Sequence, residues 1–91
     1  MHPLSIEKEL VALQPFIRRE VLSDAQAVYE RRSKLERAVV LGNLYKVKSR
    51  ICFETQEGSK VIETTIWSVT NNYVIIKGGQ VIPVECISSV E

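Results

Sequence analysis

The chain has 91 residues, of which 45% are hydrophobic and 25% are charged, and this balance excludes a disordered chain. Its 12 basic and 11 acidic residues leave a formal net charge of +1, so no global field would hold a polyanion or an anionic membrane. A chain of this length fits a single domain, residues 1–91, in which each apolar face must find a partner.

Localisation and metal content are also bounded by the sequence. No apolar run approaches the roughly 20 residues that span a bilayer, and the N-terminus lacks the basic and apolar regions of a signal peptide. We therefore expect a cytoplasmic protein in which Cys52 and Cys86 are reduced and packed as small hydrophobic residues. Together with His2 they are too few ligands for a zinc site, so we expect neither a metal nor a cofactor.

Residues 5–41 are predicted to form an N-terminal helical arm. Ser5 is a candidate N-cap, and the apolar residues that follow it recur at helical spacing as Ile6, Leu10, Leu13 and Ile17. Pro15 interrupts this pattern, because it lacks an N–H and pushes Gln14 out of the α region. Ser23 opens a capping-box pattern and allows a new start. The arm is therefore one kinked helix or two or three pieces.

The second half of the arm has an amphipathic pattern. Its apolar stripe, with Arg32 as the one polar member, consists of Val21, Ala25, Val28, Leu35 and Val39. Glu30 with Lys34, and Arg32 with Glu36, are spaced four residues apart, as ion pairs on a solvated helix face are. Gly42 predicts a left-handed cap that ends the helix at Leu41.

The stretch from Tyr45 to Glu54 predicts the first strand, because its side chains alternate between two faces. One face carries Val47, Ile51 and Phe53, and the other carries Lys46, Lys48, Arg50 and Cys52. This basic stripe is a candidate contact for nucleic-acid phosphates, as is Lys77 at the Gly78-Gly79 turn. The alternative is a solvated edge-strand face and an ordinary hairpin turn.

Further strands follow, rich in β-branched and aromatic residues and separated by turn signals. They span Lys60–Thr70, Tyr73–Lys77, Gln80–Val84 and Ile87–Val90. Apolar residues occupy both faces of these strands, whereas a small closed barrel has one interior. We therefore expect the second apolar set to lie under the helical arm or against another subunit. The candidate residues for this packing or interface are Val28, Leu35, Trp67, Tyr73 and Ile75.

Gly58 to Glu91 resembles the Sm-like family, above all its bacterial RNA-chaperone branch, Hfq. Gly58 leads into a long strand and a polar turn, and the stretch Pro83-Val84-Glu85-Cys86-Ile87-Ser88 stands where that branch has Tyr-Lys-His-Ala-Ile-Ser. The resemblance implies an α+β fold in which the helical arm precedes a five-stranded Sm-like or SH3-like barrel, residues 44–91, that assembles through strand edges. Val84 and Glu85 replace the lysine and histidine of the family's RNA pocket, so that pocket is not carried over.

The predicted function is that of a non-enzymatic interaction or assembly module, forming a homo-oligomer or binding another protein. With one histidine near the terminus and Asp24 as the one aspartate, the sequence lacks the parts of a nucleophilic triad. The alternative function is binding of RNA or single-stranded DNA. It would use the basic residues Lys46, Lys48, Arg50 and Lys77, with Trp67 and Tyr73 as stacking platforms for bases.

Overall fold

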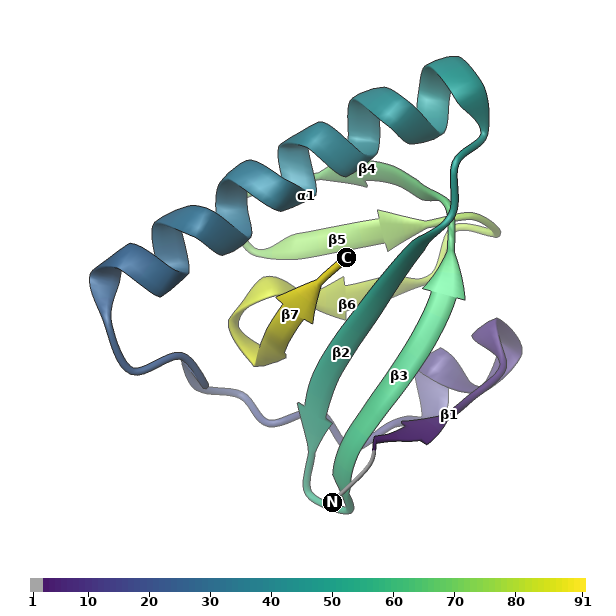
Figure 1. Cartoon of the computed structure of the whole chain (residues 1–91). Coiled ribbons are helices and arrows are strands. Elements are labelled where there is room, and N and C mark those ends of the chain that lie inside the picture. Colours follow the sequence, from purple (N-terminus) through teal and green to yellow (C-terminus); the bar gives the residue numbers. More distant parts are fainter. Residues whose placement is uncertain (1–2) are drawn as a thin grey trace.

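The computed structural model describes residues 3–91 and has an α+β fold with one α-helix and two β-sheets (Figure 1). In chain order the elements are β1 (Leu4–Ser5), the 3-10 helix η1 (Lys8–Leu13), α1 (Ala25–Tyr45), β2 (Ser49–Thr55), β3 (Gly58–Thr64), β4 (Ile66–Val69), β5 (Tyr73–Ile76), β6 (Val81–Pro83), the 3-10 helix η2 (Val84–Cys86) and β7 (Ile87–Val90). Along the described residues, no helix combines the length and apolar character needed to cross a membrane.

The strands form a four-stranded sheet, in the order β1-β3-β2-β7, and a three-stranded sheet, in the order β4-β5-β6. The expectation of one closed five-stranded barrel is therefore wrong. The predicted strand 60–70 divides at Thr65, because Thr64 still pairs with Ser49 of β2 whereas Ile66 already pairs with Ile76 of β5. The chain thus passes from the first sheet to the second at Thr65, and it returns through η2.

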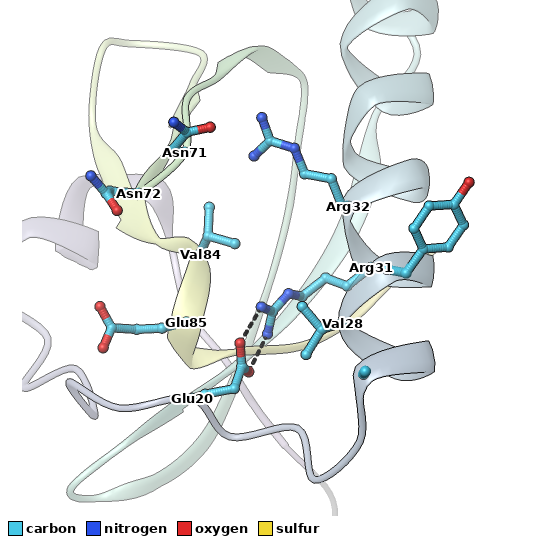
Figure 2. A pocket seen from close by; sticks show the side chains of 10 residues that line it. Glu20, Val28, Arg31, Arg32, Asn71, Asn72, Val84 and Glu85 are labelled. Atoms are coloured by element: carbon cyan, nitrogen blue, oxygen red, sulfur yellow. Dashed lines mark hydrogen bonds and ion pairs between the residues drawn. The ribbon is translucent and has the colours of Figure 1, made fainter.

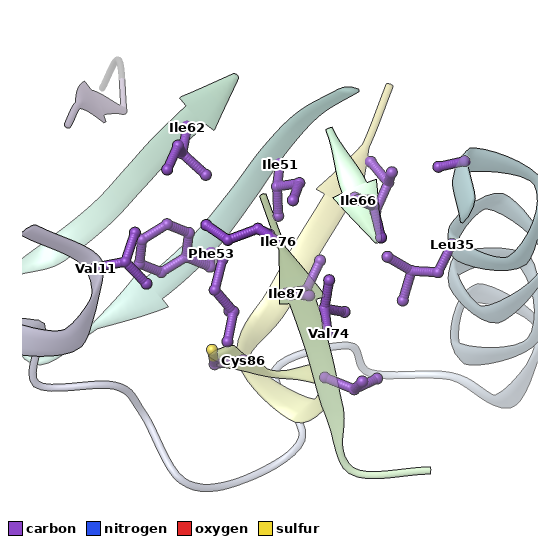
Figure 3. Close-up of a cluster of buried hydrophobic side chains, with 14 residues drawn as sticks. Val11, Leu35, Ile51, Phe53, Ile62, Ile66, Val74, Ile76, Cys86 and Ile87 are labelled. Atoms are coloured by element: carbon purple, nitrogen blue, oxygen red, sulfur yellow. The ribbon is translucent and has the colours of Figure 1, made fainter. Parts of the chain in front are cut away.

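The hydrophobic core lies between the two sheets (Figure 3). Its largest members are the fully buried Phe53, Leu35, Ile51, Ile62, Ile66, Ile76, Ile82 and Ile87. The helices contribute to it as well: Leu35 and Ala38 come from α1, Val11 comes from η1, and Val84 and Cys86 come from η2. Figure 3 shows Leu35 and Val11 reaching in from opposite ends. Since α1 packs against the edge strands β4 and β7 and η1 against the edge strand β6, the helices close the openings at the sides of the sheet pair.

The N-terminal part of the predicted arm is not helical. Ser5 belongs to β1, which pairs in parallel with β3, and Ile6 donates its N–H to the carbonyl of Val61 at 3.0 Å. η1 ends at Leu13 because Gln14 is extended in front of Pro15, as the proline rule predicts. The interruption at Pro15 is confirmed, and Ser5 as a helix N-cap is wrong.

Residues 14–24 run as an extended segment, so this part of the predicted helical arm is not helical. Backbone hydrogen bonds fix this segment against the sheets. The N–H of Ile17 donates to the backbone carbonyl of Glu54, that of Gln56 to the carbonyl of Pro15, and that of Val21 to the backbone carbonyl of Glu85. These tertiary bonds satisfy backbone groups that a helix would otherwise satisfy locally.

The N-cap of the α-helix lies one residue after the predicted Ser23, and the helix ends at Tyr45, four residues beyond the predicted end at Leu41. Asp24 is the N-cap, and its carboxylate accepts a hydrogen bond from the N–H of Ala27 at 2.8 Å. At the other end the left-handed residue is Lys46, with φ 59°, whose N–H donates to the carbonyl of Gly42. Gly42 lies inside the helix, so the interpretation of it as the helix stop is wrong.

Gly42 allows α1 to approach β4 closely. A Cβ at this position would lie 2.8 Å from the carbonyl oxygen of Ile66 and 2.9 Å from Cγ2 of Thr65. Both distances are shorter than van der Waals contact, and one of the two atoms belongs to the backbone of the junction between the sheets. The position therefore requires glycine for packing.

Gly42→Ala is expected to destabilise the protein although alanine is the better helix former. The gain in helix propensity is about 1 kcal/mol, whereas overpacking costs about 1–3 kcal/mol, so we expect a net loss of about 1 kcal/mol. Urea denaturation measures this loss. Ser33→Ala, an exposed change in the same helix, is the control and should stay within about 0.5 kcal/mol of wild type. A more stable Gly42→Ala protein would contradict the close packing.

Candidate functional site

The outer face of the sheet β4-β5-β6 carries a row of apolar side chains that face solvent. Ile75 pairs directly with Val81, so both side chains stand on the same side of the sheet. Their neighbours Val74 and Ile82 point into the core and are fully buried. Trp67 is 45% exposed, Val81 is 44% exposed and Ile75 is half-buried. We define the outer face as Trp67, Tyr73, Ile75 and Val81.

The helix does not cover this face. Leu35 belongs to the same core cluster as Ile66 and Val74 (Figure 3). α1 therefore lies at the β4 edge, where it closes the opening between the sheets. For Trp67 and Ile75 the helical arm, one of the two expected covers of the second apolar set, is therefore excluded, and the alternative of another subunit remains a prediction. Of the predicted packing residues, Leu35 serves the core, whereas Tyr73 and Ile75 stand on the outer face of β5. Trp67 is exposed at the register irregularity of β4, next to Ser68, which pairs with Ile75.

Arg18 borders the outer face beside Tyr73. Its Nη2 donates a hydrogen bond to the Tyr73 hydroxyl at 3.4 Å and lies 3.5 Å from Oε1 of Glu85. The guanidinium carbon is 5.8 Å from the centre of the Tyr73 ring. This contact attaches the extended segment to β5 and gives the apolar row a polar rim, the arrangement found at protein interfaces.

A cleft of about 530 Å³ lies between the N-terminal half of α1, the β4–β5 turn and η2 (Figure 2). Arg31 and Glu20 form a bidentate ion pair on its wall, with Nη2 to Oε1 at 2.5 Å and Nη1 to Oε2 at 2.6 Å. Nη1 of Arg31 also donates to the carbonyl of Ile87 at 2.9 Å. Arg31 is thus already neutralised by Glu20, and the pair ties the extended segment to α1 and β7.

This ion pair shifts the titration of its carboxylate. Hydrogen bonds from the Arg31 guanidinium lower the pKa of Glu20 below the ordinary glutamate value, more than its partial burial raises it. The ion pair joins the buried guanidinium of Arg31 to the partly exposed carboxylate of Glu20. Its role is to hold the segment 14–24 in place.

Sequence reasoning missed Arg31 because the predicted apolar stripe of the helix includes Arg32 in its place. The buried row of α1 is Arg31, Leu35, Ala38 and Gly42. The available signal was that Arg31 lies four residues before Leu35 and so shares its face. Arg32 forms the predicted contact with Glu36 at 3.5 Å and donates to the carbonyl of Thr70 at 2.6 Å.

Two further helix residues, Val28 of the apolar stripe and Glu30 of the expected ion pair with Lys34, make other contacts than predicted. Val28 lines the cleft rather than an interface with the strands (Figure 2). Glu30 accepts a hydrogen bond from Nε2 of Gln26 at 3.0 Å, and among the described residues it forms no ion pair with Lys34.

The candidate nucleic-acid residues do not form a stripe along one strand. Lys46 caps α1 and Lys48 lies in the connection to β2, so of the predicted stripe only Arg50 and Cys52 lie in a strand. Arg50 lies 3.6 Å from Glu63. The β5–β6 turn nevertheless meets the start of β2, because the N–H of Lys77 donates to the carbonyl of Thr65, next to the pair of Thr64 with Ser49.

Residues 3–91 contain no cluster of metal-ligating side chains, and one of the two cysteines is fully buried. That part of the chain contains no group of three or more His, Cys, Asp and Glu side chains that could hold a metal ion. Both cysteines are free, and Cys86 is fully buried with its thiol donating to the carbonyl of Pro83 at 3.2 Å. Burial raises the pKa of Cys86 to about 12, so its thiolate is scarce near neutral pH.

The Cys86 thiol is expected to resist alkylation until the protein unfolds. In a Cys52→Ser variant, the folded protein at pH 8 should react with a thiol reagent at less than about one hundredth of the rate of the denatured protein, because the group is both buried and protonated. Time-resolved absorbance with a chromogenic disulfide measures this. Rapid labelling without unfolding would show that η2 opens in the native state.

Comparison with known proteins gave no family for this chain: no protein-family model, no curated protein and no solved structure matches it. The outer face, the cleft and the lysines around Thr65 (Lys46, Lys48 and Lys77) therefore have to be interpreted from their own geometry.

Proposed function

We propose that this protein is a non-enzymatic assembly module that associates with copies of itself through the outer face of β4-β5-β6. The observation that carries the proposal is the row of solvent-facing apolar side chains Trp67, Ile75 and Val81 on the face of this sheet that points away from the core. Adjacent apolar side chains that face water on a small domain mark an interaction surface.

A second copy fits this face for geometric reasons. A flat sheet face packs well against an identical face across a two-fold axis, because each residue then meets its own counterpart or a neighbour of the same character. The aromatic side chains Trp67 and Tyr73 are the types that dominate binding energy at such contacts. The resemblance to the Sm-like family supports assembly as well, since that family forms rings, and an Sm-like ancestry of the two sheets is part of this proposal.

The fluorescence of Trp67 tests the proposal, because this is the one tryptophan of the chain. Association buries the indole, so its emission should shift to shorter wavelength as the protein concentration rises. Val81→Lys, which adds a charge beside Ile75, should hold the emission at the position of the dilute protein. Val40→Lys on the exposed side of α1 is the matched control and should behave as wild type. Emission independent of concentration in wild type would refute association through this face.

Binding of RNA or single-stranded DNA is a second candidate function. The observation that favours it is the end of the molecule at which Lys46, Lys48 and Lys77 converge near Thr65. None of these three lysines pairs with a carboxylate among residues 3–91, and the neighbouring Tyr45 is exposed and offers a stacking surface.

Fluorescence anisotropy of a labelled single-stranded oligonucleotide tests this second candidate. Binding at low salt that weakens steeply as salt is raised would support it, because each phosphate contact releases counterions. Lys48→Glu and Lys77→Glu should then each reduce affinity, whereas Lys8→Glu, at the far η1, should not. No binding at low salt would remove the candidate.

A further inference from the structure

Two other surfaces of the molecule are apolar and carry opposite charge. The first is a groove of about 470 Å³ between the C-terminal half of α1, the start of β2 and the end of β7. Its floor is formed by Ala38, Leu41, Val47 and Val90. Its rim carries the exposed cations Lys34, Arg37 and Lys48 against the single carboxylate side chain of Glu91.

The rim cations of this groove form no ion pair with the residues that the structure describes. In residues 3–91 the ion pairs use Arg18, Arg31, Arg32, Arg50 and Lys60, and none uses a rim cation of the groove. An apolar floor enclosed by unpaired cations is complementary to an apolar element that carries carboxylates.

Such an element is present in the same chain, on the exposed side of η1. In a 3-10 helix the side chains three residues apart eclipse one another, so Glu7 at the N-cap, Leu10 and Leu13 stand in one row. Leu10 is 44% exposed and Leu13 is 77% exposed, while Val11 on the opposite row is buried in the core. Glu9 lies beside this row, and neither Glu7 nor Glu9 belongs to an ion pair in the described part of the chain.

We infer that the η1 row of one copy docks into the α1–β2 groove of the next, with Leu10 and Leu13 on the apolar floor and Glu7 and Glu9 against Lys34, Arg37 and Lys48. η1 and α1 lie at opposite ends of the core, which Val11 and Leu35 enter from opposite directions (Figure 3), so the two surfaces cannot meet within one molecule. The contact is head-to-tail, and repetition of it closes a ring or extends a filament. This inference rests on the proposed self-association and adds a second, separate interface to it.

Reversal of charge on the two sides tests the inference. Glu7→Lys and Arg37→Glu should each lower the association constant about tenfold, and the two together should recover it to within about threefold of the starting value. Glu7 makes no capping hydrogen bond and Arg37 is exposed, so both variants should fold, which circular dichroism checks. Lys77→Glu, the same charge change outside the groove, is the control and should have no effect.

Sedimentation velocity in a Val81→Lys background separates this contact from the outer face. The inference predicts residual association in that background, weakened by Leu13→Ser and by raised salt. If wild type associates but Val81→Lys is monomeric at every concentration, the head-to-tail contact is refuted and the outer face stands. Residual association that both single charge reversals leave unchanged would also refute it.

Discussion

Leu35→Ala is expected to lower the free energy of unfolding by about 3 kcal/mol, within the usual range for a fully buried leucine. Leu35 is the side chain through which α1 reaches the core beside Ile66 and Val74, so its loss leaves a cavity at the open edge of the sheet pair. For a domain of this size the melting temperature should fall by more than about 10 °C. Thermal and urea denaturation measure the effect.

Leu44→Ala provides a matched control for this prediction. It removes the same atoms from the same helix, but Leu44 is 67% exposed, so we expect a change within about 0.5 kcal/mol. Equal losses for the two variants would mean that α1 does not pack on the core through the Leu35 row.

Glu20→Ala is expected to cost about 2 kcal/mol, because it leaves the buried Arg31 guanidinium with the Ile87 carbonyl as its one remaining acceptor. Loss of a partner from a fully buried pair costs more, but Glu20 is 38% exposed and water can replace part of its contact. The double variant Glu20→Gln with Arg31→Met should regain much of the loss, since no buried charge remains. A double-mutant cycle by urea denaturation measures the coupling.

The ion pair of Glu20 with Arg31 also makes the free energy of unfolding decrease at acid pH. The pKa of Glu20 is lower in the folded than in the unfolded protein, so its contribution is complete above the unfolded value, about 4.3, and is lost as pH falls through the folded value. Wild type should therefore lose more stability than Glu20→Gln below about pH 4.3. Parallel pH profiles for the two proteins would contradict the ion pair.

The strands were largely predictable from the sequence because their signals are local. β-branched runs bounded by Asn71-Asn72 and Gly78-Gly79 place β5 and β6 within a residue or two, and the bounds of β7 match the prediction. The division at Thr65 was not predictable, since it depends on which partner strand each residue finds. The same holds for β1, where the edge of β3 outweighs the helical spacing of Ile6 and Leu10.

The candidate site was also predictable only in part, because the sequence gives local signals and not the packing between elements. The alternation of side chains along the strands identified Trp67, Tyr73 and Ile75 as apolar residues beyond those needed for one core. Alternation does not say whether a helix lies over these residues or beside them. The ion pair of Glu20 with Arg31 joins an extended segment to a helix, and no spacing rule brings those two residues together.

Light scattering on the full chain from low to high micromolar concentration tests the central claim, that the exposed face of β4-β5-β6 mediates self-association. The account predicts a mass of at least twice the 10.3 kDa of one chain, which decreases on dilution and is reduced by Val81→Lys but not by Val40→Lys. A mass of 10.3 kDa at every concentration would contradict it.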